Sequence, residues 1–252
     1  MKIATWNVNS LRVRLPHVLI WLRDVNPDVL ALQETKLPDT DFPFEAFREV
    51  GYSAVAVGQK TYNGVAILSR QNVTDIIMDI PHLEDPQRRV VGLTIDHTRV
   101  LNLYVPNGEK VTSEKYQYKL NWLEKLDNFL KSELIKYPKL IVLGDFNIAP
   151  YDIDVHDPKF WEGQVLFSQP ERKALQTILQ HGLHDRFRQL NPKEKSFTWW
   201  DYRLNAFRRN MGLRIDHIFA STSLQCTQCY IDKVPRAWDR PSDHAPVIAE
   251  FA

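Results

Sequence analysis

The sequence predicts a single-domain α/β fold, with two β-sheets packed face to face and helices on the outside. Short β-type runs dominate the chain, and helical patterns lie between some of them. No linker, low-complexity run or internal repeat interrupts the 252 residues. Polar segments that resemble parts of one site come from both ends of the chain, so one domain covering residues 1–252 is expected. Periodicity alone does not separate this arrangement from other α/β folds.

The β-type runs are the expected strands. The run from Leu140 to Leu143 is short, apolar and uninterrupted, which is typical of a strand buried in a sheet, and Gly144 is expected to end it. The expected strands are 2–6, 28–33, 52–57, 63–69, 73–80, 89–95, 98–105, 139–143, 214–220, 228–234 and 246–251.

Helices are expected in three places between these strands. Residues 16–24 suit a helix with proline in its first turn. Residues 113–136 carry large apolar side chains at spacings of three or four, which predicts an amphipathic helix whose apolar stripe packs on the core. Ser168, followed by Pro and Glu, is an N-cap signal for a helix that runs to about residue 181 and is closed by glycine.

Local charge is more informative than the total. The formal net charge is +1, from 32 basic and 31 acidic residues, and this balance does not by itself identify a nucleic-acid-binding protein. Segment 202–215 differs, because it contains several arginines and no acidic residue and is flanked by aromatic residues. That mixture suits contact with a phosphate backbone and with bases, so Arg203 and Arg214 are candidate DNA contacts.

Neither a membrane span nor a redox or zinc site is expected. No stretch reaches the roughly 18 apolar residues of a membrane helix, and the first residues lead into a strand without a signal-peptide core, so a cytoplasmic protein is expected. Cys226 and Cys229 form a C-x-x-C without a second pair, and in a strand residues three apart point to opposite faces. They receive no function. A monomer is the default expectation.

Polar side chains follow strand after strand. Asp145 and Asn147 come directly after the buried run 140–143, although a plain Asx turn explains this pentapeptide equally well. The recurrence of the pattern favours a site, because ligands of α/β sheets bind outside the carboxyl ends of strands. Further Asn, Glu, Asp and His residues lie at or beside strand ends at Asn7, Glu34, Asp216, Asp243 and His244.

These segments, in order and over nearly the whole chain, resemble the exonuclease III group of abasic-site DNA-repair nucleases within the endonuclease/exonuclease/phosphatase superfamily. The resemblance implies a four-layer α-β-β-α sandwich of two packed mixed β-sheets with outer helices. It also implies a phosphodiesterase that acts on damaged double-stranded DNA. The matching segments are TWNVNSLRVRL, LALQETK, GQKTYNGVAILSR, NLYVPNGE, LGDFNIAP, FTWWDYR, GLRIDHI and RPSDHAPV.

Phosphodiester hydrolysis needs a metal ion, an activated water and donors for the phosphoryl oxygens. Glu34 is the best metal-ligand candidate, since Mg²⁺ prefers oxygen ligands, and Asn7 can ligate or orient beside it. The resemblance implies a Mg²⁺ site at Asn7 and Glu34, with Asp243 in or near the coordination sphere and Mn²⁺ able to substitute.

The resemblance implies the remaining roles. Asp145 and Asn147 match positions that orient and activate water and bind phosphate, with the base-or-orienter role of Asp145 left open. Asp216 and His244 match an Asp–His pair, in which the carboxylate fixes the tautomer and favours the charged ring. Tyr104 matches a position that contacts the scissile phosphate. Asn9 and Lys60 match positions for site support and backbone contact. Trp199 and Ile215 match a small hydrophobic pocket that receives the deoxyribose at the lesion.

One position departs from the family pattern. Leu166 stands where abasic endonucleases of the family usually have a small residue before phenylalanine. A leucine bordering the lesion pocket would crowd a sugar flipped out of a continuous strand, whereas a blocked 3′ end need not be extruded. The hypothesis is a bias towards 3′-phosphatase, 3′-phosphodiesterase or 3′→5′ exonuclease activity and away from internal abasic-site incision.

Two alternatives remain. The same chemistry serves inositol-phosphate or sphingomyelin phosphodiesterases of the superfamily, but the segments FTWWDYR and GLRIDHI match the repair group. A non-catalytic DNA-binding relative is the other alternative, and the presence of every core position argues against it.

Overall fold

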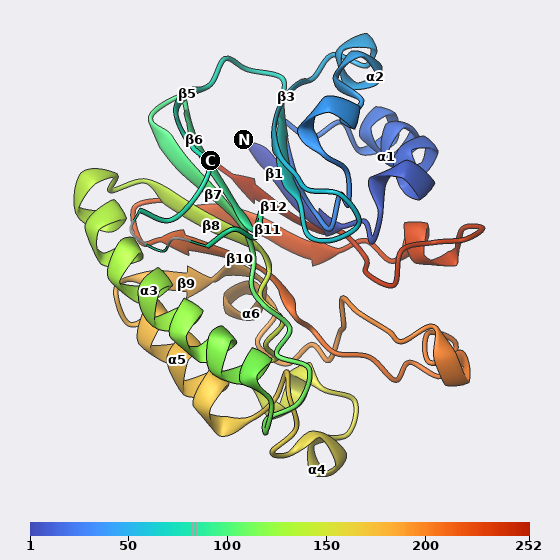
Figure 1. Cartoon of the computed structure of the whole chain (residues 1–252), viewed down its shortest axis with the longest axis vertical. Coiled ribbons are helices and arrows are strands. Elements are labelled where there is room, and N and C mark those ends of the chain that lie inside the picture. The colour runs from blue at the N-terminus through green and yellow to red at the C-terminus, as the bar shows by residue number, and fades with distance from the viewer. Residues whose placement is uncertain (82, 84) are drawn as a thin grey trace.

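Two six-stranded sheets pack face to face, and helices cover both outer faces (Figure 1). The computed structural model describes residues 1–81, 83 and 85–252. The expected four-layer α-β-β-α sandwich is therefore confirmed. No helix in these described ranges combines the length and apolar character needed to cross a bilayer.

The first sheet joins the two ends of the chain. The N-terminal strand pairs in parallel with the next strand and antiparallel with the last one, where Lys2 lies opposite Glu250. Its order is β11 (Cys226–Ile231), β12 (Val247–Phe251), β1 (Lys2–Asn7), β2 (Val29–Gln33), β4 (Val65–Ser69) and β3 (Ser53–Val57).

The second sheet repeats this plan around its own central parallel pair, β7 and β8. All its other pairings are antiparallel, so both sheets are mixed. Its order is β5 (Thr74–Ile77), β6 (Val90–Ile95), β7 (Thr98–Tyr104), β8 (Leu140–Asp145), β10 (Asp216–Ser221) and β9 (Leu183–Asp185).

Each outer face is covered by amphipathic helices (Figure 1). Helices α1 (Leu11–Val25) and α2 (Phe44–Glu49) pack on the first sheet, and α3 (Glu114–Lys136) and α5 (Gln169–Leu179) pack on the second. The predicted cap of α5 is present, with Ser168 and Glu171 forming a reciprocal capping box. The short elements α4 (Pro158–Trp161), α6 (Arg186–Leu190), α2 and β9 were not predicted, because runs this brief carry too little periodicity.

Several predicted boundaries were wrong, among them the strand expected at 73–80, which is Thr74–Ile77, and the strand expected at 228–234, which is Cys226–Ile231. Helix α1 begins at Leu11 rather than at Pro16, because the buried side chains of Leu11 and Val18 pack the earlier turn onto the sheet. Gly144 does not end β8, which continues to Asp145. A Cβ at Gly144 would lie 1.9 Å from the carbonyl oxygen of Leu103 on β7, so glycine here permits the close approach of two strands.

A buried amide ties the two sheets together beside the carboxyl ends of their central strands. Asn102 of β7 donates to the carbonyl oxygens of Leu32 and Ala66 in the first sheet, both at 2.9 Å. Its own oxygen accepts from Gln33 Nε2 at 2.7 Å. Gln33 immediately precedes Glu34, and Asn102 lies two residues before Tyr104, so this network fixes one sheet against the other next to both side chains.

Candidate active site

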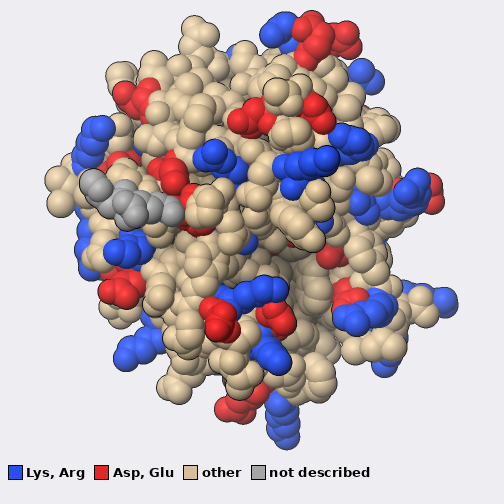
Figure 2. Space-filling model, viewed as in Figure 1, with Lys and Arg blue, Asp and Glu red and all other residues tan. Residues whose placement is uncertain are grey.

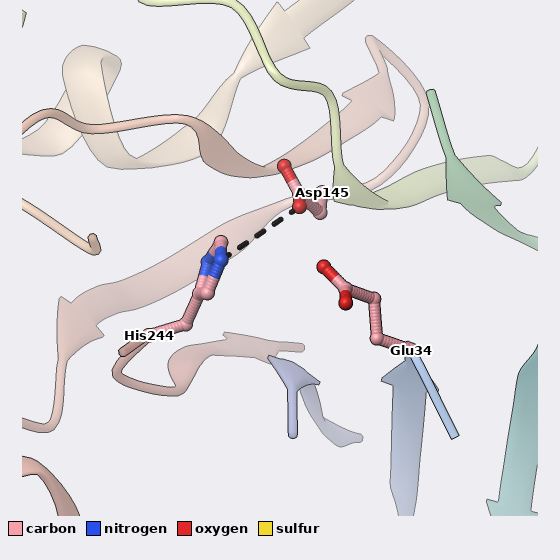
Figure 3. A group of neighbouring side chains, drawn as sticks. All are labelled: Glu34, Asp145 and His244. Atoms are coloured by element: carbon pink, nitrogen blue, oxygen red, sulfur yellow. Dashed lines mark ion pairs between the residues drawn. The ribbon is translucent and has the colours of Figure 1, made fainter. Parts of the chain in front are cut away.

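The carboxyl ends of the four central strands meet at one edge of the sandwich and carry the predicted site residues. Asn7 ends β1, Glu34 follows β2, Tyr104 ends β7 and Asp145 ends β8. Figure 3 shows Glu34, Asp145 and His244 reaching from different segments towards a common space. Their potential ligand atoms lie within 4.8 Å of one another.

Asn7 connects the carboxylates of the two sheets. Its Nδ2 donates to Glu34 Oε1 and to Asp145 Oδ2, both at 2.9 Å. Its Oδ1 accepts from the backbone nitrogen of Asn9 at 2.9 Å, so that oxygen already has one partner. In this arrangement Asn7 orients both carboxylates.

The predicted Asp–His pair is present. His244 Nδ1 lies 2.8 Å from Asp216 Oδ2, and His244 Nε2 lies 3.9 Å from Asp145 Oδ2. Burial alone would lower the pKa of His244, but the charge of Asp216 and the hydrogen bond to it outweigh burial and raise this pKa to about 10. An imidazolium has no lone pair for a metal ion, so His244 is suited to donate to a phosphoryl oxygen from Nε2.

Asp145 is held in the charge environment that a general base needs. Burial and the neighbouring charge of Asp216 raise the pKa of Asp145, while His244 and Asn7 partly offset them. Its Oδ1 accepts from the backbone nitrogen of Asn147 at 2.9 Å, which fixes the carboxylate in an Asx turn. A carboxylate whose pKa is raised towards neutrality is a better proton acceptor for water at physiological pH.

A second wall of the site is built from asparagines and a tyrosine. Asn147 Nδ2 donates to the carbonyl oxygen of Val105 at 3.0 Å, and Asn147 Oδ1 accepts from Asn107 Nδ2 at 3.0 Å. Burial, with the charges of Glu34 and Asp145, raises the pKa of Tyr104 well above its usual range. The Tyr104 hydroxyl therefore stays protonated and available as a donor.

The donor set fits a divalent metal ion. Glu34 and Asp145 offer carboxylate oxygens at one edge of the cluster, and hard cations prefer oxygen ligands. Asp243 lies outside this cluster, since its Oδ1 accepts from Asn9 Nδ2 at 2.9 Å and its Oδ2 accepts from Trp199 Nε1 at 3.0 Å. The ligand roles of Asn7 and Asp243 stay predictions.

The residues predicted to form the hydrophobic pocket come from three segments of the chain and pack against one another. Leu166, Trp199 and Ile215 belong to one apolar cluster, together with Leu213, which sequence reasoning missed. Trp199 is half-buried and the other three side chains are buried. Leu166 has φ +75°, in the left-handed region that favours glycine. The chain thus places a bulky residue where the backbone itself suits glycine.

The expected DNA contact at Arg214 is wrong. Its guanidinium is buried and pairs with Asp154 at 2.7 Å and with Asp185 at 2.7 Å, so it holds three segments together. Trp200 of the aromatic flank is likewise buried. Arg203 is exposed and pairs with Asp201 at 2.6 Å, so its predicted role as a DNA contact remains open.

Lys60 is exposed, and its predicted backbone contact also stays a prediction. Lys and Arg are interspersed with Asp and Glu on the face shown in Figure 2, in line with the small net charge.

Three polar residues of the site were not predicted. Lys36 Nζ lies 2.9 Å from Glu34 Oε2, and Asn107 contacts Asn147. Both lie inside segments that carried the family resemblance, LALQETK and NLYVPNGE, which was a usable signal. Lys119 is buried beneath Asn147, and the usable signal was its position within the apolar stripe of the helix, three residues after Tyr116 and four before Leu123.

Comparison with known proteins agrees with this geometry. The model of the Endonuclease/Exonuclease/phosphatase family matches residues 4–244. Exodeoxyribonuclease III of Haemophilus influenzae is 38% identical over 100% of both chains. A structure of the 3′ phosphatase NExo from Neisseria, bound to a product DNA hairpin, superposes with a TM-score of 0.99 at 47% identity, covering 100% of this chain and 99% of that one.

An AP endonuclease from Archaeoglobus fulgidus gives a TM-score of 0.97 at 41% identity, with 100% of this chain and 99% of that chain covered. The resemblance found in the sequence is thereby confirmed. The chain belongs to the endonuclease/exonuclease/phosphatase family, as an exodeoxyribonuclease III-like hydrolase of DNA repair.

Proposed function

We propose that this enzyme is a Mg²⁺-dependent hydrolase that removes blocking groups from the 3′ ends of duplex DNA in preference to incising internal abasic sites. Overall similarity does not separate the two activities, because a 3′ phosphatase and an AP endonuclease both superpose on the whole chain. The observation that carries the proposal is Leu166. Its buried side chain packs with Trp199 and Ile215, the two residues that the family resemblance assigns to the pocket for an extruded abasic sugar.

The site residues supply the chemistry of phosphomonoester hydrolysis at a 3′ end. Asp145 accepts a proton from water, and the water oxygen forms a bond to phosphorus as the bond between phosphorus and the 3′ oxygen breaks. The His244 imidazolium and the Tyr104 hydroxyl donate to the phosphoryl oxygens, where negative charge develops. Solvent protonates the released 3′ oxygen, and inorganic phosphate leaves.

A divalent ion held by Glu34, with Asp145 and Asn7 beside it, would neutralise charge on the phosphoryl group. Oxygen donors of this kind suit Mg²⁺ and also accept Mn²⁺. A cytoplasmic location and a monomeric state stay predictions from the sequence. Full-length similarity to exodeoxyribonuclease III favours DNA over inositol phosphates or sphingomyelin as substrate.

The substitution Leu166→Gly tests the proposal. Glycine empties this side of the pocket and suits the left-handed backbone, so abasic-site incision is expected to rise relative to 3′-phosphate removal in the same preparation. Leu166→Met is the matched control, since it conserves volume and should leave the ratio as in the wild type. An unchanged ratio in Leu166→Gly would refute the role of Leu166 in substrate choice.

A further inference from the structure

A buried lysine lies directly behind the asparagine wall of the site. Lys119 of α3 is 0% exposed, and its ammonium has three N–H donors. Two of these donors bond to the carbonyl oxygens of Asn147 at 2.6 Å and of Asn107 at 3.2 Å, and the ammonium forms an ion pair with Glu171 Oε2 at 2.5 Å on a third segment. The buried charge is therefore both hydrogen-bonded and paired with a carboxylate, which is the condition for burying it.

The three acceptors come from the loops that shape the site. Asn147 follows β8 and has φ +51°, a left-handed conformation that turns its carbonyl oxygen towards the ammonium. Asn107 follows β7, and the neighbouring Gly108 lies so close to Lys119 that an added Cβ would be 3.2 Å from the lysine Cδ. The same cation thus fixes both asparagines whose side chains bond to each other.

Glu171 connects Lys119 to the segment that contains Leu166. Glu171 Oε1 accepts from the backbone nitrogen of Ser168 at 2.9 Å and from its hydroxyl at 2.7 Å. Ser168 lies two residues after Leu166, so the Lys119–Glu171 pair reaches the segment that lines the sugar pocket. The buried Lys119–Glu171 ion pair consequently connects the segments of Asn107 and Asn147 with the segment of Leu166, which is proposed to govern substrate choice.

We propose that Lys119 is a positioning residue that holds the Asn107 and Asn147 loops, and through Glu171 the Leu166 loop, in their productive geometry. The expected effect on catalysis rests on the proposed function, but the ordering of the loops can be measured without any substrate. Misplacing groups that bind the reacting phosphate lowers the rate of the chemical step more than it weakens binding.

The first experiment replaces the pair by apolar residues of similar length, Lys119→Met with Glu171→Met. Such replacement of a buried ion pair is often neutral for stability, so the variant is expected to fold. Amide hydrogen exchange in peptides containing Asn107 and Asn147 should rise at least ~10-fold as local opening becomes easier. For 3′-phosphate removal, kcat should fall roughly 10- to 100-fold with KM changed by less than about 3-fold.

The matched control is a second buried ion pair on the same helix. Arg99 and Glu133 lie 2.8 Å apart, and Glu133 belongs to α3 as Lys119 does, but the pair is remote from the site. Arg99→Met with Glu133→Met should leave loop exchange and kcat at wild-type values. Lys119→Arg is the second variant, since it keeps the cation and its donors.

Loop exchange and kcat should be closer to wild type in Lys119→Arg than in the double methionine variant. A folded double variant with wild-type loop exchange and kcat would overturn the proposal. If the double variant does not fold, Lys119→Arg decides the matter, because loop exchange raised at least ~10-fold over wild type in this variant would overturn the proposal and near-wild-type exchange would support it. A wild-type enzyme inactive on every DNA substrate would refute the proposed function, while the exchange measurement would still decide the role of Lys119.

Discussion

Asp145 and Asp216 lie directly opposite each other in the antiparallel register of β8 and β10. Two carboxylates this close in a buried site repel, and His244 offsets the repulsion from both, with Nδ1 2.8 Å from Asp216 and Nε2 3.9 Å from Asp145. The sheet register therefore gives the two carboxylates different roles. Asp216 holds the His244 imidazolium, and Asp145 accepts a proton from water.

Replacing Asp216 should impair catalysis without abolishing the fold. In Asp216→Asn, His244 loses the charge that keeps it protonated and oriented, so kcat for 3′-phosphate removal is expected to fall roughly 10²-fold. Steady-state kinetics at neutral pH measures the effect. A matched control is Asp127→Asn, which disrupts the Asp–His pair between Asp127 and His181 on the surface, 2.6 Å apart, and should leave kcat unchanged. Wild-type turnover in Asp216→Asn would contradict the role given to the pair.

Arg214 should matter for stability rather than for DNA contact. In Arg214→Met, Asp154 and Asp185 lose their shared cation while buried, and breaking such a pair costs roughly 3–5 kcal/mol of unfolding free energy. Urea denaturation measures this cost. The exposed Arg203→Met is the comparison and should change stability by less than about 0.5 kcal/mol. Similar small effects of both substitutions would show that the Arg214 network contributes little.

His217 should make the fold sensitive to mild acid. Burial and Arg214 lower the pKa of His217 from 6.5 to about 4, and the ring accepts at Nδ1 from Arg214 while donating from Nε2 to the carbonyl oxygen of Ile148. Between these two values the unfolded chain binds a proton that the folded chain does not. Stability is therefore lost as pH falls through this window, by about 2 kcal/mol between about pH 7 and about pH 5.

Urea unfolding at the two pH values tests this expectation. His217→Gln can keep both hydrogen bonds with a group that does not titrate, so the variant should lose less stability than the wild type over the same interval. Equal pH dependence in the two proteins would show that other groups cause it.

Gly144 should not tolerate a side chain. An added Cβ would lie 1.9 Å from the Leu103 carbonyl oxygen, so Gly144→Ala must push β7 and β8 apart beside Asp145 and is expected to cost roughly 3 kcal/mol or more. Gly163 is the matched control because it also has positive φ, +71°, but nothing lies within 4 Å of its added Cβ. Gly163→Ala should cost only about 1 kcal/mol, by thermal or urea unfolding. Equal losses of unfolding free energy in the two variants would mean that the positive φ, and not the close approach of β7 and β8, explains why residue 144 is glycine.

The sequence was most predictive where local patterns coincide with the final contacts. The N-cap signal at Ser168 and the apolar run before Asp145 are local, and both are confirmed. The recurrent polar residues at strand ends also converge as predicted, with Glu34, Asp145 and His244 in one cluster.

Prediction failed where a role depends on partners distant in sequence. Arg214 resembles a DNA-binding arginine until Asp154 and Asp185 are seen to surround it. Lys119 is a charged residue on the apolar face of α3, and only the tertiary fold brings the carbonyl oxygens of Asn107 and Asn147 to it. Buried charges of this kind are specified by topology, which composition and periodicity do not encode.

The most direct test of the account compares two substrates with the wild-type enzyme, in the presence of Mg²⁺ and of a chelator. One substrate is a nicked duplex ending in 3′-phosphate, and the other is an intact duplex with an internal abasic-site analogue. Mg²⁺-dependent release of phosphate from the first substrate and much slower incision of the second are expected. Equally efficient incision of the abasic duplex, or phosphate release that survives the chelator, would contradict this expectation.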